Sequence, residues 1–285
     1  MTIPLRNSLS YIFIIIGLCC SAQRNIDYAF VQNLIIQKKN TQANYYLNYF
    51  KHSFSDDSLN FLRGYNYYLM KKPDSCSLSL IKINPSFVEW NKTQLLLSIN
   101  LDYSSNINQA ISTLNQIQND TNPIINQIKY TLYAGNMLLL RNLTAYDTIV
   151  KKFDFNNIAY EKSQINLSEL KIRILKHKEK SAIVAGMLST IMPGLGKFYV
   201  GRKGEAMAAF STNIIFAGMA AEAYYRTKSF KSPQFIIFTT LFSFFYSGNI
   251  IGSIYSAKKQ NKSIKKQINN EILANMHIPI ANLFD

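Results

Sequence analysis

Residues 191–204 read IMPGLGKFYVGRKG, a stretch with four glycines, one proline and three basic residues between two apolar segments. Glycine-rich loops beside a lysine can bind phosphate, so this stretch is the first candidate for chemistry. A phosphate-binding P-loop requires Gly-x-x-x-x-Gly-Lys followed by Ser or Thr. Here Gly196-Lys197 is followed by Phe198, and Ile191 occupies the position of the first glycine. The sequence therefore excludes a P-loop on chemical grounds.

A dinucleotide-binding loop and an enzyme active site are no better supported. A dinucleotide loop needs a preceding strand, whereas Gly194-x-Gly196 follows an apolar run of helical character. The three histidines are far apart in the chain and the acidic residues are not clustered. No metal-site spacing or nucleophile elbow occurs, so we predict no enzyme activity, no metal and no cofactor. A lipid-active enzyme that uses Tyr199 and Arg202 is the most distant alternative.

The same stretch fits a reversal of the chain at a membrane surface. Proline ends a helix, and glycines permit a tight reversal. Phe and Tyr are common at membrane–water interfaces, and basic residues suit an anionic lipid surface. The residues of this predicted membrane hairpin are Pro193, Gly194, Gly196, Phe198, Tyr199, Gly201, Arg202 and Gly204.

This hairpin resembles a widespread family of small domains with two transmembrane helices, in which Gly-x-Gly and then Phe-Tyr-x-Gly lie between the helices. The match covers about 45 residues of the chain. The resemblance implies a membrane domain but no particular chemistry.

Three apolar segments predict a membrane domain over residues 181–257. Residues 235–257 carry no charge and are long enough for a transmembrane helix, and residues 206–225 are a good candidate. Residues 181–196 are short and contain a proline, so they can span, re-enter or lie in the interface. A water-soluble core is the alternative, but it needs a larger surrounding domain than this chain supplies.

The last apolar segment carries small residues that permit close helix contact. Gly248-x-x-x-Gly252 is such a pair, and it also permits an oligomer through the transmembrane helices. Asn249, and Asn213 in the previous segment, are polar groups at membrane depth, and one can satisfy the other. An ion path is the functional alternative, although no acidic residue lies in the middle of these segments.

The positive charge lies mainly near these segments. Residues 171–285 hold 16 of the 31 Lys and Arg residues but 5 of the 16 Asp and Glu residues, in a chain with net charge +15. This distribution favours membrane flanks over nucleic-acid binding. We expect a basic linker helix over residues 156–180 and a basic tail over residues 258–285. The positive-inside rule places the tail in the cytoplasm.

The N-terminus has the features of a signal peptide over residues 1–22. Arg6 precedes a short apolar core, and small residues suit cleavage after Ala22. Lipidation at Cys19 or Cys20 and an uncleaved anchor remain open alternatives. Cleavage leaves Cys76 as the one cysteine, which precludes an intramolecular disulfide. With an exported N-terminal part and a cytoplasmic tail, three membrane crossings are favoured over two.

A repeat of helical pattern occupies residues 23–155. A polar turn, a small residue and an apolar helix occur four times, and the small residues are separated by 33, 34 and 35 positions. A second small position lies twelve residues earlier; Val31 occupies it in the first repeat, and it is shifted by one in the last. Small residues let antiparallel helices cross closely. The predicted repeat-packing residues are Ala43, Gly64, Cys76, Ser98, Ala110, Ala134 and Ala145.

This pattern resembles the tetratricopeptide-repeat (TPR) family over about residues 25–155. The resemblance implies stacked helix pairs with a concave surface that holds peptides or partner proteins. We therefore expect an all-α fold, with a TPR-like solenoid of about four repeats followed by two to three transmembrane helices.

These features predict a membrane-anchored helical-repeat protein that presents a protein- or peptide-binding scaffold in a bacterial cell envelope. The expected location is the inner membrane, with the repeats in the periplasm. The expected partners are membrane lipids and a protein or peptide, but no nucleic acid. The alternative is a transporter or channel accessory component whose active part is the transmembrane helix bundle.

Overall fold

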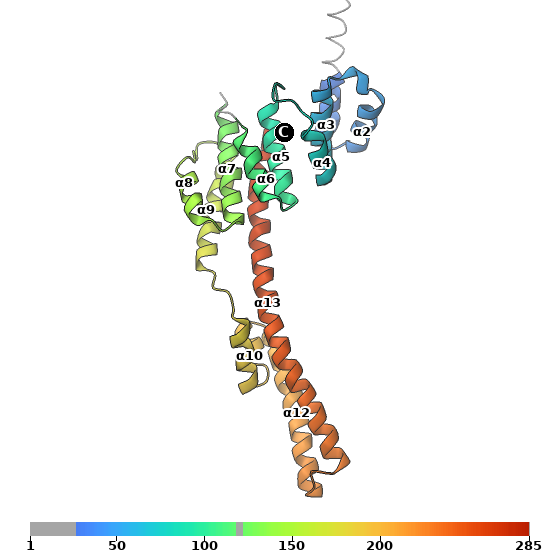
Figure 1. Ribbon diagram of the computed structural model, residues 1–285, viewed down its shortest axis with the longest axis vertical. Helices are drawn as coiled ribbons and strands as arrows, with labels where there is room; N and C mark the ends of the chain where they lie inside the picture. The colour runs from blue at the N-terminus through green and yellow to red at the C-terminus, as the bar shows by residue number, and fades with distance from the viewer. Residues whose placement is uncertain (1–26, 118–121, 285) are drawn as a thin grey trace, which may run out of the picture. The chain divides into compact units, whose positions relative to one another are not determined.

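A computed structural model describes residues 27–117 and 122–284 of the chain (Figure 1). The described residues form helices joined by turns and loops, without a strand. The predicted signal peptide, including Cys19 and Cys20, lies outside the described residues. The chain forms two compact units. Unit 1 contains the described residues up to Ile172 together with Glu271–Phe284, and unit 2 runs from Arg173 to Asn270.

Unit 1 consists of helix pairs followed by a single helix. The first helix of the first pair covers residues 27–36. The other helices are α2 (Asn40–Tyr49), the short 3₁₀ helix at Lys51–Ser53, α3 (Asp56–Leu69), α4 (Pro73–Leu80), α5 (Trp90–Tyr103), α6 (Ile107–Asn115), α7 (Pro123–Leu139), α8 (Leu143–Val150) and α9 (Glu161–Lys176). The pairs α3–α4, α5–α6 and α7–α8 are each in contact. The all-α prediction is thus confirmed, while membership of the TPR family stays a prediction.

The turn inside each helix pair has the same backbone geometry. One non-glycine residue in each turn is left-handed, with φ between 56° and 63°. In all four turns the next backbone N–H donates to the carbonyl five residues earlier, at 2.9–3.0 Å, which satisfies the end of the first helix. The left-handed residues are Lys38, Lys71, Ser105 and Arg141. The repeat predicted from small residues is therefore also a repeat of backbone structure.

The predicted packing residues lie at fixed distances from these turns. Seven positions before the left-handed residue the chain is buried in every pair, at Val31, Gly64, Ser98 and Ala134. Five positions after it the side chain is also buried, at Ala43, Cys76, Ala110 and Tyr146. Ala134 thus keeps the register. The displacement lies in the second helix of the last pair, where Tyr146 is buried and Ala145 is only half-buried.

Two of the helix crossings show why small residues are needed. A Cβ atom on Gly64 would lie 2.3 Å from Cδ2 of Leu80, so α3 and α4 cross without room for a side chain there. The Ser98 hydroxyl donates to the Ala110 carbonyl at 3.2 Å, joining α5 to α6. Burial raises the pKa of the Cys76 thiol to about 12, which makes this cysteine a packing residue without thiolate reactivity.

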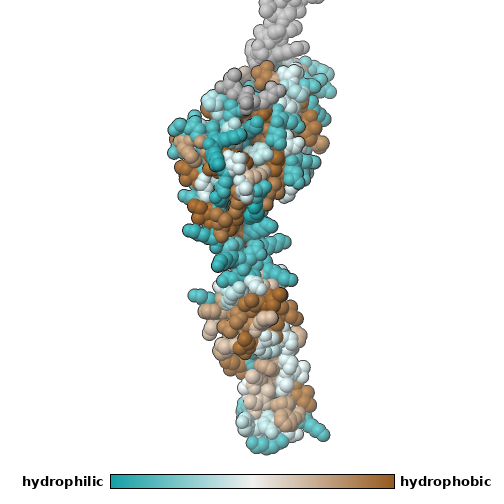
Figure 2. Space-filling view, turned by 60° about the vertical axis from the view of Figure 1, so that its left-hand side comes forward, coloured by the Kyte–Doolittle hydropathy of each residue, from teal (hydrophilic) through white to brown (hydrophobic). Residues whose placement is uncertain are grey.

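Unit 2 contains the end of α9, α10 (Ala182–Ile191), α11 (Leu195–Val200), α12 (Lys203–Thr227) and the part of α13 (Pro233–Phe284) up to Asn270. Both α12 and α13 are long and apolar enough to cross a membrane. Large apolar side chains on them are exposed, including Met207 (61%), Phe244 (73%) and Ile251 (67%). Figure 2 shows this apolar surface on unit 2. Such exposure is expected against lipid and not in the core of a soluble protein.

Helix α10 is apolar but shorter than the two helices that are long enough to cross a membrane. Its 10 residues span about 15 Å, roughly half of a hydrocarbon core. Just before it, Lys180 exchanges two backbone hydrogen bonds with the Asn261 side chain, at 2.9 and 3.0 Å. Beyond its other end, the Gly194 N–H donates to Oδ1 of Asn249, in the middle of the apolar part of α13. Helix α10 therefore runs beside part of α13, and α11 turns the chain back.

Two of the described helices, and not three, are long and apolar enough to cross a membrane. A second observation within unit 1 leads to the same number. Glu271–Phe284 packs with the helices that precede residue 173, so both parts of unit 1 must lie on one side of a membrane. Only an even number of crossings between them allows this. The charge rule favoured three crossings because residues 181–196 were counted as a span, whereas the helix α10 within them has 10 residues.

We predict that Gly64→Ala destabilises unit 1 by about 1–3 kcal/mol, because the new methyl group overpacks the contact with Leu80. The measurement is urea unfolding followed by fluorescence of Trp90, the only tryptophan, which lies at the start of α5. Gly218→Ala is the control, since nothing lies within 4 Å of a Cβ atom there. Equal unfolding midpoints for Gly64→Ala and the unmodified protein would contradict the close crossing.

Candidate helix-docking surface and membrane hairpin

The first helices of the pairs, α3, α5 and α7, together with α9, form a surface that is occupied by the end of the chain. We call it the docking surface, and its occupant is Glu271–Phe284, the last turns of α13 (Figure 1). Three side chains spaced by four residues, Ile272, Met276 and Ile280, are completely buried. A helix that buries one apolar stripe in this way is bound as an amphipathic helix is bound by a partner protein.

Met276 makes the closest contact of the docked helix. A Cβ atom on Gly135 of α7 would lie 2.3 Å from the Met276 sulfur and 2.4 Å from its Cγ. Gly135 is therefore the residue that leaves space for this side chain. At the end of the helix, the ring of Phe284 stacks on Tyr65 of α3 with centroids 4.5 Å apart. Both contacts are apolar and shape-dependent.

Polar contacts fix the register of the docked helix. The Asn166 amide donates to Oδ1 of Asn275 at 2.7 Å, and the Asn282 amide donates to the Ala159 carbonyl at 3.0 Å. The Tyr68 hydroxyl is hydrogen-bonded to Nδ1 of His277. Burial, and to a lesser extent the charge of Lys71, lowers the pKa of His277. The imidazole is therefore neutral near pH 7, and its Nδ1 can accept a hydrogen bond from the Tyr68 hydroxyl.

The docked helix is the last part of the segment 258–285, which the sequence predicts as a basic tail. Only the first part of that segment is strongly basic, and its last 14 described residues belong to unit 1. The signal was present in the sequence as Ile268, Ile272, Met276 and Ile280, four apolar residues at helical spacing. The adjacent lysines concealed it, because they fit a membrane flank equally well.

A cavity of about 650 Å³ opens beside the docked helix within unit 1. Aromatic and polar groups from α3, α5 and the docked helix surround it, and the Asn100 amide at its wall donates to the Pro73 carbonyl at 2.7 Å. The lining residues are Tyr68, Leu69, Lys71, Pro73, Asn100, Tyr103 and His277. Because His277 forms part of the wall, the cavity exists in this form only while the end of the chain is docked.

A buried carboxyl group lies in α5, beneath the docking surface. Asp102 is 3% exposed, and the amide of Asn136 in α7 donates to its two oxygens at 2.6 and 3.1 Å. Burial raises the pKa of Asp102 to about 8, and this hydrogen bond lowers it only partly. A carboxyl group without a cationic partner is held neutral in this way. It joins α5 to α7 and does not face the cavity described above.

The predicted membrane hairpin has two glycines in backbone conformations that other residues rarely adopt. Gly194 and Gly201 have φ of 88° and 96° and lie at the two ends of α11. A Cβ atom on Gly194 would lie 2.3 Å from the Ala206 carbonyl oxygen, and one on Gly196 would lie 1.9 Å from that of Ala185. Three of the glycines are therefore required by geometry. At Gly204, nothing lies within 4 Å of a Cβ atom.

The other hairpin residues lie at the end of the reversal. Phe198 is 54% exposed and Pro193 is half-exposed. The Tyr199 hydroxyl accepts a hydrogen bond from the Ser181 N–H at 3.3 Å, which ties α11 to the start of α10. Arg202 pairs with Glu205 at 2.8 Å. The structure thus does not bring Tyr199 and Arg202 together as partners in one polar contact.

The predicted helix-contact residues behave differently from expectation. Asn249 does not satisfy Asn213: its Oδ1 accepts the Gly194 N–H, while the Asn213 amide donates to the Ala209 carbonyl at 2.8 Å. Nothing lies within 4 Å of a Cβ atom on Gly248, and Gly252 approaches only the Lys197 side chain, at 3.6 Å. Close packing on α13 occurs against α10 instead, through the Ser189–Ser253 hydrogen bond of 2.7 Å.

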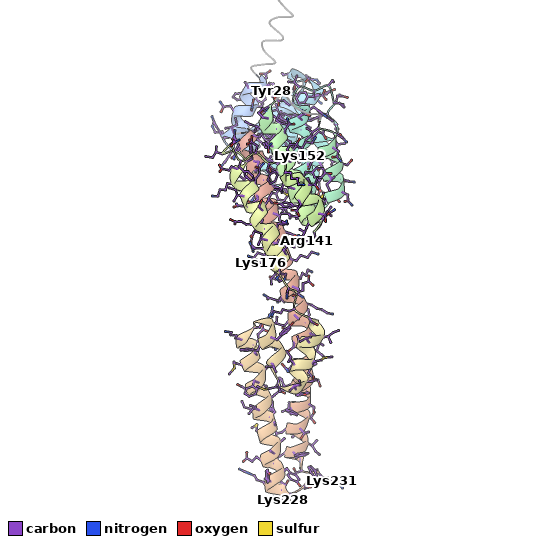
Figure 3. The ribbon with its side chains drawn as sticks, turned by 90° about the vertical axis from the view of Figure 1, so that its left-hand side faces the viewer. Tyr28, Arg141, Lys152, Lys176, Lys228 and Lys231 are labelled. Carbon is purple, nitrogen blue, oxygen red and sulfur yellow. The ribbon has the colours of Figure 1, made fainter. Side chains whose placement is uncertain are left out.

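The cations of unit 2 flank its apolar surface. Lys228 and Lys231 lie at the closed end of the α12–α13 hairpin (Figure 3), where Arg226 also pairs with Glu222.

Within the described ranges, no group of three or more His, Cys, Asp or Glu residues is placed to hold a metal ion. Comparisons with protein-family models, with curated proteins and with solved structures found no significant match to this chain.

We predict that Asp102→Asn stabilises unit 1 increasingly as the pH rises from about 4 to about 8. In this range the unfolded chain loses the Asp102 proton while the folded protein retains it, so the stability of the unmodified protein falls with pH. The difference between the two proteins in the free energy of unfolding should grow by at most about 1.4 kcal/mol per pH unit. Urea unfolding followed by Trp90 fluorescence at several pH values measures it. Parallel pH profiles for the two proteins would contradict the buried, neutral carboxyl group.

Proposed function

We propose that this chain is a membrane-anchored helical-repeat protein that presents a helix-binding scaffold in a bacterial cell envelope. The observation that carries the proposal is the seating of Glu271–Phe284 on the docking surface, which is the usual geometry for recognition of an amphipathic helix. The chain's own end is the resident ligand. A partner with a similar apolar stripe then competes for the same surface.

Tethering gives this scaffold its mechanism. A docked helix on the same chain has a high effective concentration, so only a partner that is itself held near the membrane, or that binds more tightly, can displace it. Anchoring through α12 and α13 places the docking surface within reach of such membrane-bound partners. Weak or freely diffusing helices are excluded. The resident helix therefore sets the threshold for binding.

We assign the scaffold to the outer face of the inner membrane, because residues 1–22 have the features of a signal peptide. The end of the chain is then exported too, and the short loop with Lys228 and Lys231 is cytoplasmic, as the charge rule for short loops requires. The basic segments around Lys176 and Lys258 oppose this orientation under the same rule. They would bind anionic lipid heads on the outer face.

We predict that removing residues 271–285 frees the docking surface for a peptide. The full-length protein and a version ending at Asn270 are reconstituted in lipid nanodiscs, and binding of a fluorescent peptide with the sequence of residues 266–285 is followed by anisotropy. The shortened protein should bind the peptide, whereas the full-length protein should bind it at least about tenfold more weakly, because its own helix competes.

A matched peptide with Met276→Glu is the control for that experiment. Its charge would be buried against Gly135 without a partner, so binding to the shortened protein should be lost. Equal binding of both peptides would show that the docking surface does not read the apolar stripe. Lack of binding by a shortened protein that retains its helical circular dichroism would also count against the proposal.

We predict that compartment-sensitive reporters fused after Glu169 and, separately, after Asp285 report the same side of the membrane. This result follows from two crossings and from the composition of unit 1. Signals outside the cytoplasm for both fusions support the exported orientation. Cytoplasmic signals for both would overturn the signal-peptide assignment, and opposite sides would overturn the two-crossing arrangement.

A further inference from the structure

Unit 2 contains a cavity of about 320 Å³ between α11, α12 and α13. Its volume is roughly ten times that of one water molecule in the liquid, ~30 Å³. The polar residues in its wall are Lys197, Glu205, Thr212, Asn213 and Asn249, and the apolar ones include Phe244 and Phe245. Asn213 lies about 15 Å from the start of α12, well inside a hydrocarbon core of ~30 Å.

Two amide atoms in this wall are buried without a hydrogen-bond partner. Asn213 is 2% exposed and its Oδ1 accepts no hydrogen bond, while Asn249 is 5% exposed and its Nδ2 donates none. One side chain thus offers an acceptor and the other a donor to the same space. Leaving both unpaired at membrane depth is unfavourable, so an occupant that satisfies both is expected.

The cavity also holds a charge that the protein does not neutralise. The ammonium of Lys197 has no hydrogen-bond or ion-pair partner in the part of the chain that the structure describes. Glu205 at the same wall pairs with Arg202, at 2.8 Å, and its side chain is 50% exposed. The site therefore presents a cation with an amide donor for an anion, and an amide acceptor for a donor group.

The remaining wall suits hydrocarbon. Phe244 is 73% exposed and Phe245 is 39% exposed, and both lie on the apolar surface of α13 that we assign to lipid. An occupant that enters from the bilayer can place its polar part against the asparagines and its chains along these rings. A water cluster would satisfy the amides but would leave Lys197 unpaired and these rings wet.

We propose that this cavity binds the head of a glycerophospholipid that carries both a phosphate and a hydrogen-bond donor. The phosphate pairs with Lys197 and accepts from Nδ2 of Asn249. The donor group, which is the hydroxyl of a glycerol head or the ammonium of an ethanolamine head, bonds to Oδ1 of Asn213. A choline head is excluded, because its quaternary nitrogen has no N–H.

The test uses the full-length protein in detergent, with phosphatidylglycerol, phosphatidylethanolamine or phosphatidylcholine added in increasing amounts. Native mass spectrometry counts the lipid retained, and the thermal midpoint is measured in parallel. Retention of one phosphatidylglycerol or one phosphatidylethanolamine supports the site, and the stronger of the two identifies the head. Equal retention of phosphatidylcholine, or no retention of any lipid, would overturn the proposal.

Two variants locate the binding. Lys197→Met removes the cation and retains the apolar stem, and Asn249→Asp removes the donor while keeping the oxygen that accepts the Gly194 N–H. Each should weaken lipid retention by about tenfold, the usual size of a lost charge-assisted hydrogen bond. Lys203→Met removes the same charge from an exposed position and should have no effect. A comparable loss in Lys203→Met, or none in Lys197→Met, would refute the assignment.

Discussion

The contact between Met276 and Gly135 is the constraint on which the rest of the structure depends. It seats the end of the chain on α7, and the buried side chains of Ile272 and Ile280 extend the contact to either side. A helix that comes after the membrane segments therefore belongs to the same unit as the helices that come before them. Two helices between them, α12 and α13, are long enough to cross a membrane, which agrees with an even number of crossings.

Unit 2 contains the reversal of the chain at α11. The chain can turn back there because Gly194 adopts a left-handed conformation close to Ala206, and because Asn249 accepts its N–H. The asparagine that supports the reversal is also one of the two with an unpaired amide atom at the cavity. The fold of the hairpin and the proposed lipid site thus depend on the same side chain.

Much of this architecture could be predicted from the sequence, because the signals are local. Helix pairs were visible in the spacing of Ala43, Cys76 and Ala110, and the long apolar runs predicted α12 and α13. The unforeseen features are long-range. No local pattern reveals that Asn249 bonds to Gly194 rather than to Asn213, or that Met276 packs against Gly135. The lysines at positions 258–266, within α13, favoured a membrane flank, so the apolar stripe of its last turns was missed.

The most direct test of the central claim is a cross-link between positions 135 and 276. Gly135→Cys and Met276→Cys are introduced into a protein whose natural cysteines are serine, and membranes are oxidised and examined on non-reducing gels. Docking within one chain predicts a disulfide-linked monomer, and none when Ile278→Cys, on the exposed face, replaces Met276→Cys. Absence of the cross-link, or cross-linked dimers alone, would contradict the docking of the chain's own end.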